Sequence, residues 1–564
     1  MTNPTSNAPR TGGRILVDQL LRHGVKHAFC VPGESYLEVL DALHDSDIEL
    51  TVCRQEGGAA MMAEAHGKLT GEPGICFVTR APGATNASAG VHIALQDSTP
   101  MILFVGQINR GMRGREAFQE LDYRAAFGPQ AKWATEVDDP TRLPEIISRA
   151  FHLATSGRPG PVVIALPEDM LVEEALVVDA PHYAPVLSAP SDAQLAELEN
   201  RLRQAKTPVA ILGGSTWNAD AVEQFARFAL RLNLPVAVSF RRQMLFPADH
   251  PCFIGDLGLG ANPSLLDTVR HADLVLLVGG RLSEVPSQSY QLFDVPLPAQ
   301  PLVHVHPDSD ELNRVYRADL AIQAGAGAFC AELDKITLPA ETESESRTAA
   351  MRASYLAWSD PANIRTPGAL QMGGVMTWLE ANLPPDAILC NGAGNYATWL
   401  HRFHRFTRYG TQLAPTSGSM GYGVPAAVGA QRLHPHRTVV AFAGDGCFLM
   451  HGQEFATAVQ YGLPIIVLVF DNSMYGTIRM HQEREYPGRV SGTALKNPDF
   501  AAYARAFGGH GERVETTEAF GPAFQRAQAS GLPAILHCII DPEAITPNTT
   551  LGAIRSQAQA RAGS

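Results

Sequence analysis

The stretch RTVVAFAGDGCFLMHGQEFATAVQYGLPIIVLVFDN, residues 437–472, carries the pattern that decides the fold. An apolar run ends in a Gly-Asp-Gly turn around Asp445, a helical segment follows to Gly462, and a second apolar run ends at Asn472. Two short apolar runs on either side of a helix are typical of neighbouring strands in a parallel sheet. Asp445 and Asn472 therefore fall at the carboxyl ends of these strands, which is the edge of an open α/β sheet where ligands bind.

The residues at this edge also indicate what it binds. The Asp445 carboxylate, the Asn472 amide oxygen and nearby backbone carbonyls are hard oxygen ligands, suited to a Mg²⁺ ion that holds a diphosphate. Gly444 and Gly446 allow the backbone to approach phosphate groups closely. The alternative is that the Gly-Asp-Gly stretch is only a turn and Asn472 only a cap, because short glycine motifs also match by chance.

Alternating apolar strands and helices recur in three blocks of the 564-residue chain. The first block contains strands such as GICFVT and MILFVG, the second TPVAILGG and ADLVLLVGG, and the third the opening stretch and LPAILHCIID. A Pro-rich connector near residue 190 and the polar segment 338–355 are expected to be linkers, and the tail after Leu551 is expected to be loose. The pattern predicts an α/β protein with three doubly wound parallel-sheet domains, spanning residues 1–185, 190–340 and 366–550.

Composition and charge exclude several functional classes. A formal net charge of −13 argues against a general nucleic-acid binder and offers no polybasic patch for a membrane. The eight cysteines include no Cys-x-x-Cys pair, so they fit neither a disulfide framework nor a zinc site and indicate free thiols in a reducing compartment. The N-terminal segment lacks a signal-like apolar core, and the apolar run LPIIVLVF is too short to span a bilayer. We expect a soluble cytoplasmic protein that binds neither nucleic acid nor a membrane.

Two more stretches hold residues of chemical interest. In CRQEGGAAMMAEAHGKLTG, residues 53–71, Glu56 follows a strand and opens a helix of small residues. In TSGSMGYGVPAAVGA, residues 416–430, Met420 comes directly after a Gly-Ser turn. Taken alone, Glu56 is a carboxylate in a favourable position at a helix N-terminus, and Met420 is a residue that fills a core.

Taken together, these stretches resemble the thiamin diphosphate-dependent enzymes, and the 27-residue step from Asp445 to Asn472 fits that family. The resemblance covers nearly the whole chain, in the order pyrimidine-binding, central and diphosphate-binding domain. It implies thiamin diphosphate and Mg²⁺ as cofactors, with Asp445, Asn472 and the backbone carbonyl of Met474 as metal ligands. It also implies that Met420 holds the cofactor in a bent shape. Glu56 would hydrogen-bond the pyrimidine ring and promote its imino tautomer.

Other segments are most similar to acetolactate synthase and its relatives. These are APGATNASAGVHIALQDSTPMILFVGQ, residues 81–107, and AFQE, residues 117–120; the resemblance implies that Phe118 and Gln119 line the active site. NGAGNYATW, residues 391–399, is similar to the loop on the diphosphate side. The cofactor-binding residues implied by the resemblance are Gly394, Asn395, Tyr396, Gly418, Met420, Asp445, Gly446, Cys447, Asn472, Met474, Tyr475 and Gly476.

The resemblance departs from acetolactate synthase at residues that concern the substrate. The segment RLSEVPSQ, residues 281–288, places Val285 where the family has an arginine that receives the carboxylate of the acceptor keto acid. His481 stands at the position of a tryptophan associated with larger acceptors, and Thr477 at the position of a methionine. These departures indicate a different substrate and leave a decarboxylase or diketone lyase of the same family as the alternative. Arg281 or Arg479 could supply the missing cation.

Flavin binding and a second metal site are two further questions raised by the central block. Its glycine segment is GDLGLGANP, residues 255–263, in place of the GMHG-type segment that contacts FAD in the family, so FAD is open but doubtful. His304 and His306 alternate on one face of a strand, but no other ligands accompany them. We expect them to be histidines at a strand end near a loop.

Three classes of protein are compatible with doubly wound blocks. We expect a thiamin diphosphate-dependent enzyme that forms or cleaves C–C bonds in small 2-oxo acids or 1,2-dicarbonyl compounds. A nucleotide-dependent oxidoreductase is the remote alternative, since the chain lacks a Gly-x-Gly-x-x-Gly turn in the required context. A non-catalytic binding subunit is the third, although Glu56, Met420, Asp445 and Asn472 are all present. The resemblance also implies an active site shared between two subunits, and hence a homodimer, or a homotetramer built from two dimers.

Overall fold

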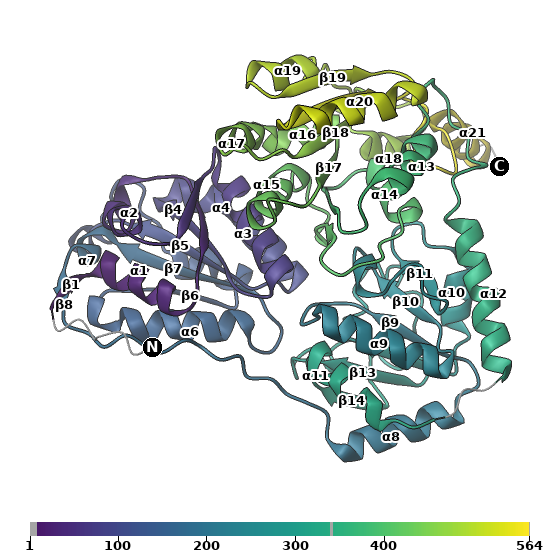
Figure 1. The fold of residues 1–564 in the computed structure, drawn as a ribbon, viewed down its shortest axis with the longest axis horizontal. Coiled ribbons are helices and arrows are strands. Elements are labelled where there is room, and N and C mark those ends of the chain that lie inside the picture. Colours follow the sequence, from purple (N-terminus) through teal and green to yellow (C-terminus); the bar gives the residue numbers. More distant parts are fainter. Residues whose placement is uncertain (1–7, 339–341, 563–564) are drawn as a thin grey trace. The chain divides into compact units, whose positions relative to one another are not determined.

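The computed structural model describes residues 8–338 and 342–562, which form two compact units. The first unit comprises residues up to 186 together with 428–433, and the second comprises the remainder. One six-stranded sheet lies in the first unit and two lie in the second (Figure 1). All neighbouring strands within these three sheets are parallel. The predicted fold class, three doubly wound α/β domains, is therefore confirmed.

The first sheet has the strand order β3-β2-β4-β5-β7-β6. Its central strands are continuous apolar runs because helices cover both faces of a parallel sheet. The strands are β2 (His27–Cys30), β3 (Glu49–Val52), β4 (Gly74–Thr79), β5 (Met101–Gln107), β6 (Trp133–Glu136) and β7 (Pro161–Pro167), and β1 (Arg10–Thr11) pairs with β8 (Glu174–Ala175) in a separate antiparallel ribbon. The helices are α1 (Gly12–Arg22), α2 (Leu37–His44), α3 (Glu56–Thr70), α4 (Arg80–Asp97), α5 (Tyr123–Phe127), α6 (Leu143–Thr155) and α7 (Glu168–Leu171).

The second sheet has the strand order β11-β10-β9-β12-β13-β14. Two apolar clusters, one on each face, form the core around it. Its strands are β9 (Pro208–Leu212), β10 (Val236–Ser239), β11 (Phe253–Leu257), β12 (Leu274–Val278), β13 (Leu302–His306) and β14 (Leu320–Gln323). Its helices are α8 (Asp192–Gln204), α9 (Ala219–Leu232), α10 (Pro263–Arg270), α11 (Ala326–Ala331) and α12 (Thr342–Trp358).

The third sheet has the strand order β16-β15-β17-β18-β20-β19. From β15 the chain continues to one side and from β17 to the other, so the order reverses between these two strands, where ligands bind in such sheets. The strands are β15 (Ile388–Asn391), β16 (Gln412–Leu413), β17 (Val439–Gly444), β18 (Ile466–Asp471), β19 (His510–Val514) and β20 (Ala534–Ile539). The helices are α13 (Met372–Asn382), α14 (Tyr396–Phe403), α15 (Gly423–Leu433), α16 (Asp445–His451), α17 (Phe455–Gln460), α18 (Gly476–Glu485), α19 (Phe500–Ala506), α20 (Thr517–Ser530) and α21 (Leu551–Ala562).

The stretch of residues 437–472 forms the two neighbouring parallel strands that its sequence predicts, β17 and β18. The helix between them differs from the prediction. It begins at Asp445, directly after the strand, and is divided by a 3₁₀ turn over Gly452–Glu454. The second part ends at Gln460, and Gly462 has a φ of +61° in the turn that follows. The helix breaks at His451, whose φ of −140° and ψ of 25° are not helical, and a glycine is required next to it because a Cβ at Gly452 would lie 2.6 Å from the Phe448 ring.

The polar segment 338–355 is not an open linker as predicted. Residues 339–341 lie outside the described part, and residues 342–355 belong to helix α12, which Figure 1 shows as one long helix. Its composition of Glu, Ser, Ala and Arg allows a helix. Tyr355 is buried with its ring 4.9 Å from that of Phe253, and Arg352 donates to the Phe253 carbonyl at 3.1 Å. The contacts of one face of α12 therefore hold in place a segment whose composition is that of a linker.

The tail after Leu551 is also helical, so the prediction of a loose end is wrong. Leu551 and Ile554 are buried in a small cluster with Ile545. Arg555 forms a two-pronged ion pair with Glu483 of α18, with distances of 2.8 and 2.7 Å. The helix is held by its first turn and by this pair, and neither produces apolar periodicity along its length.

Two expectations from composition can be compared with the structure. All eight cysteines fall within the described residues, and each is a buried free thiol. In the described part of the chain, no helix is both long and apolar enough to cross a membrane.

Candidate active site

A cavity of about 260 Å³ opens at the carboxyl edge of the third sheet. Its walls come from the segments that follow β15, β17, β18 and β20 and from the turn before α15. We call it the edge cavity. The structure brings into its lining all the residues that the resemblance implies for cofactor binding: Gly394, Asn395, Tyr396, Gly418, Met420, Asp445, Gly446, Cys447, Asn472, Met474, Tyr475 and Gly476.

Two tyrosine rings packed over glycines shape the wall of the edge cavity. A Cβ added at Gly446 would lie 2.6 Å from the Tyr475 ring, and one at Gly394, whose φ is +148°, would lie 2.7 Å from the Tyr396 ring. The Tyr396 hydroxyl accepts from a backbone nitrogen at 3.1 Å and lies 3.2 Å from Cys447 Sγ. Burial raises the pKa of Tyr396 well above its usual range, so this hydroxyl stays protonated. These glycines keep room for rings as well as for a ligand.

Two buried carboxylates lie at neighbouring strand ends beside the edge cavity, and their surroundings differ. Asp471 accepts from the Ser473 backbone nitrogen and from Asn497 Nδ2, both at 2.8 Å, and from His537 Nε2 at 2.9 Å. Burial opposes the ionisation of Asp471, but these donors outweigh it and lower its pKa. Asn497 is the only side chain among the described residues that donates to Asp445, at 2.7 Å, and burial raises the pKa of Asp445. Asp445 is therefore the carboxylate with room for a cation.

The other oxygens proposed as metal ligands lie on the same wall. The Asn472 side-chain oxygen accepts from the Met474 backbone nitrogen at 3.3 Å, and the Met474 carbonyl accepts from Gly476 at 2.9 Å. Each oxygen has a second lone pair left for an ion. Within residues 8–338 and 342–562, no group of three or more His, Cys, Asp or Glu side chains could hold a metal. An ion at this wall would instead take one carboxylate, one amide and one carbonyl oxygen, a set that fits Mg²⁺.

The apolar part of the edge cavity also includes residues that were not predicted to bind the cofactor. Met420 is partly buried against the domain core, as expected of a bulky residue in the cavity wall. Trp399 comes from α14, and Ile540, Ala544 and Ile545 follow β20. The rule that ligands bind beyond the carboxyl ends of strands could have found Ile540, since it directly follows an apolar run. Ala544 and Ile545 lie in an irregular segment without such a pattern.

Thr477 and His481, two of the positions at which the sequence departs from acetolactate synthase, differ in whether they line the edge cavity. Thr477 lines the edge cavity, and its hydroxyl donates to Asn395 Oδ1 at 2.9 Å. His481 is exposed and is not part of the lining. Arg479 forms an ion pair with buried Glu483 at 2.8 Å, so its guanidinium already has an anionic partner.

Buried Glu483 joins two helices through ion pairs, and the sequence patterns did not indicate this contact. It lies on α18 and accepts from Arg479, from Arg555 of α21 and from the Gly488 backbone nitrogen at 2.9 Å. The Arg555 guanidinium is the main reason that the pKa of Glu483 falls to about 2. This pair fixes α21 beside the segment that contributes Ala544 and Ile545 to the edge cavity.

In the central sheet, Val285 lies half-buried in the loop after β12, where its carbonyl accepts from the Gln288 backbone nitrogen at 3.0 Å. The two histidines at the end of β13 make backbone contacts. His304 Nε2 lies 2.9 Å from the Gly280 carbonyl oxygen, and His306 Nδ1 accepts from Asp308 at 3.1 Å. Burial lowers the pKa of His304 to about 4, so the ring is neutral near pH 7.

The first unit holds Glu56, the proposed proton-relay residue, at the first position of α3. The preceding Gln55 caps the helix by accepting from the Gly58 nitrogen at 3.1 Å. Asn86 of α4 donates to Glu56 Oε2 at 2.9 Å, and a Cβ added at Gly83 would lie 3.4 Å from Oε1. Glu56 is half-buried, with its carboxylate oriented by one neighbouring helix.

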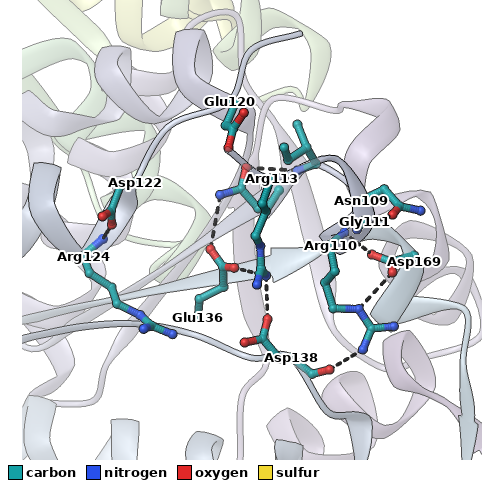
Figure 2. A network of polar contacts seen from close by, with 12 residues as sticks. Asn109, Arg110, Gly111, Arg113, Glu120, Asp122, Arg124, Glu136, Asp138 and Asp169 are labelled. Atoms are coloured by element: carbon teal, nitrogen blue, oxygen red, sulfur yellow. Dashed lines mark hydrogen bonds and ion pairs between the residues drawn. The ribbon is translucent and has the colours of Figure 1, made fainter. Parts of the chain in front are cut away.

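Phe118 and Gln119 lie on the loop of residues 109–122. Figure 2 shows the polar contacts that hold this loop. Arg113 pairs with Glu136 and Asp138 at the end of β6. Glu120 closes the tip by accepting from the nitrogens of Gly114 at 2.6 Å and Ala117 at 2.9 Å.

The conformation of this loop leaves the Phe118 side chain exposed to solvent. Gln119 has a φ of +65°, and its carbonyl accepts from the Ala81 nitrogen at 3.3 Å. Phe118 is 74% exposed, which is unusual for a phenylalanine in such a constrained loop. Of the predicted catalytic residues in the first unit, Phe118 is therefore exposed, whereas Glu56 and Gln119 are half-buried.

Comparisons with known proteins agree with this architecture. Three family models match the chain in sequence: the N-terminal TPP binding domain of thiamine pyrophosphate enzymes over residues 10–126, the central domain over 195–333 and the C-terminal TPP binding domain over 392–538. The chain belongs to the thiamin diphosphate-dependent enzyme family. This is the class that the motifs predict, in place of a nucleotide-dependent oxidoreductase.

Proteins that are similar over nearly the whole chain show which members of the family it resembles. The chain is 34% identical over 550 residues to the acetolactate synthase large subunit of Parasynechococcus marenigrum, covering 94% of this chain and 88% of that one. It is 31% identical over 571 residues to the large subunit of Corynebacterium glutamicum, covering 97% and 90%. It is 30% identical over 552 residues to the acetolactate synthase isozyme 2 large subunit of Escherichia coli, covering 97% and 98%. The enzyme is therefore acetolactate synthase-like.

Proposed function

We propose that this enzyme uses thiamin diphosphate and Mg²⁺ to form or cleave a C–C bond in small 2-oxo acids or 1,2-dicarbonyl compounds. One observation carries the proposal: the residues expected to bind the cofactor come from separate segments and line a single cavity. That cavity also contains the buried Asp445 carboxylate, to which one side chain of the described residues donates. Thiamin diphosphate, when bound, supplies the carbanion chemistry, and the protein supplies its binding, orientation and proton transfer.

Each predicted residue has a role in this proposal. Asp445, Asn472 and the Met474 carbonyl hold Mg²⁺ against the diphosphate, and the glycines of the edge cavity leave room for it. Met420 would support the bound cofactor from its partly buried position. Glu56 would hold and transfer a proton at its carboxylate. Phe118 and Gln119 line the substrate side from the 109–122 loop.

For the substrate, we propose an acceptor that lacks the second carboxylate contact. A carboxylate that enters a partly desolvated site needs a cationic partner, and Val285 supplies none. Arg479 is held by Glu483, which supports the view that it does not replace the missing arginine. A neutral diketone, an aldehyde or a proton as acceptor avoids the problem. The family alternative, a decarboxylase or diketone lyase, follows from the same residues.

The remaining proposals concern organisation. We place the pyrimidine-binding domain at residues 1–185, the central domain at 190–340 and the diphosphate-binding domain at 366–550. The active unit is a homodimer, or a homotetramer made of two dimers, because Glu56 and Asp445 lie in different domains and the resembled family shares its site between subunits. We also propose that the protein acts in the cytoplasm. Binding of FAD stays an open question, because the glycine segment 255–263 differs from the type that contacts FAD in the family.

The experiment that tests the proposed function is a substrate panel. Purified protein is incubated with thiamin diphosphate, Mg²⁺ and a series of 2-oxo acids and diketones, and products are identified by mass spectrometry. We expect turnover only with both cofactors, and the highest kcat/KM for a neutral acceptor. Equal efficiency in acetolactate formation from pyruvate would contradict the argument from Val285 and favour a plain acetolactate synthase.

A further inference from the structure

The carboxylates of Asp445 and Asp471 lie close together at the ends of adjacent strands. Asp445 directly follows β17, Asp471 ends β18, and both are buried. Two carboxylates this close repel one another unless donors or cations separate them. Asp471 has such donors in Ser473 and His537. Neither of these donors reaches Asp445, so another group must offset the repulsion between the two carboxylates.

The amide of Asn497 occupies this contact. Its Nδ2 atom donates to Asp445 Oδ2 at 2.7 Å and to Asp471 Oδ1 at 2.8 Å. An amide nitrogen carries two hydrogens, so each carboxylate receives one of them. The Asn497 oxygen is buried and has no hydrogen-bond partner among the described residues. The reversed amide would aim this oxygen at two carboxylates, so the orientation follows from the chemistry.

The loop that carries Asn497 is fixed to the loop that carries the proposed metal ligands. The Tyr475 nitrogen donates to the Thr493 carbonyl at 2.9 Å, and the Leu495 nitrogen donates to the Ser473 carbonyl at 2.8 Å. Two residues after Asn497, Asp499 caps α19 by accepting from a backbone nitrogen at 3.0 Å. Asn497 is therefore held on both sides and cannot easily follow a carboxylate that moves.

We propose that Asn497 is a positioning residue that holds the Asp445 carboxylate in place for the cation. One of its hydrogens fixes the orientation of Asp445, while the other keeps Asp471 turned toward its own donors. The remaining lone pairs of Asp445 stay available for an ion. This inference rests on the proposed function, in which Asp445 ligates Mg²⁺.

The test measures Mg²⁺ binding by the full-length protein with thiamin diphosphate at saturation. Trp399 lines the edge cavity, so tryptophan fluorescence reports its filling, and calorimetry gives the affinity independently. In Asn497→Ala we expect Mg²⁺ affinity to fall by about 10- to 100-fold, the range seen when partners of metal ligands are removed. Lys496→Ala is the matched control, because this neighbour is exposed in the same loop.

A double-mutant cycle distinguishes positioning from general loosening. If Asn497 acts through Asp445, Asn497→Ala changes affinity little in an Asp445→Asn background. Unchanged Mg²⁺ affinity in the single variant, or an equal loss in both backgrounds, would overturn the inference. Unchanged affinity in Asp445→Asn alone would overturn the metal role of Asp445, which is the separate failure of the proposed function.

A second variant keeps the test valid if Asn497→Ala does not fold. Asn497→Ser retains a hydroxyl, but one hydroxyl hydrogen cannot reach both carboxylates at once. We expect its Mg²⁺ affinity to fall while its melting temperature without cation stays close to that of the wild type. A purely structural residue would give the reverse, a lowered melting temperature with normal affinity, and that result would contradict the proposal.

Discussion

The edge cavity and the 109–122 loop contrast in how they hold their predicted residues. The edge cavity gathers side chains from several segments of one domain behind buried walls. The loop and the start of α3 instead leave Phe118 exposed and Glu56 half-buried. In the proposed function, the edge cavity binds the cofactor, and the residues of the first unit act in the turnover of enzyme that has bound it. Variants in the two regions should therefore fail in different ways.

The largest expected effect is on turnover, in Glu56→Gln. Loss of the carboxylate removes the proposed proton relay, and we expect kcat to fall about 10³-fold, which corresponds to about 4 kcal/mol of barrier. Thiamin diphosphate affinity should stay at the wild-type level. Glu145→Gln, the same change in the first turn of α6, is the control. Near-normal kcat in folded, cofactor-loaded Glu56→Gln would remove this residue from the mechanism.

The next effect concerns substrate choice, in Val285→Arg. A charge-assisted contact to an acceptor carboxylate contributes about 1.5–3 kcal/mol, or about 10- to 100-fold in kcat/KM. We expect acetolactate formation from pyruvate to rise by this factor, with no gain for neutral acceptors. Val285→Met adds length without charge and serves as the control. An equal rise in both variants would mean that side-chain size, and not charge, governs the acceptor.

A smaller effect is expected in Glu120→Gln. A glutamine can accept through one oxygen only, so one of the two nitrogens at the loop tip loses its partner. We expect kcat/KM to fall about 10-fold through misplacement of Phe118 and Gln119, with cofactor affinity unchanged. Glu116→Gln, in the same loop, is the matched control. A loss of cofactor affinity in Glu120→Gln would argue against the division between the two regions.

The smallest effect is on stability, in Arg555→Ala. This change removes the main partner of Glu483, and because the Arg555 side chain is partly exposed to solvent it should cost about 1 kcal/mol near neutral pH. The pKa of Glu483 is lowered to about 2, so the pair is fully formed above the ordinary carboxyl pKa of about 4.3 and is lost as the pH falls toward 2. Melting temperatures of wild type and variant should therefore differ at pH 7 and converge near pH 2. A constant difference across this range would contradict the ion-pair explanation.

Sequence patterns were sufficient where one segment determines its own structure. The continuous apolar runs of β17 and β18 predict buried parallel strands, and the strand-end rule then places Asp445 and Asn472 at one edge. Sequence patterns failed to predict elements whose structure depends on residues far away in the chain. Helix α21 depends on Glu483, which lies far away in the chain, and α12 depends on the burial of Tyr355. Asn497 carries no motif, because its importance comes from two carboxylates on other segments.

The most direct test of the central claim is the binding of thiamin diphosphate to the edge cavity, followed by tryptophan fluorescence or calorimetry. For the wild type we expect saturable binding with Mg²⁺ and loss of that binding when the ion is chelated. In Asp445→Asn we expect the Mg²⁺ requirement to rise by more than the roughly 100-fold associated with indirect partners. Binding that is equally tight without Mg²⁺, or unchanged in Asp445→Asn, would contradict the account.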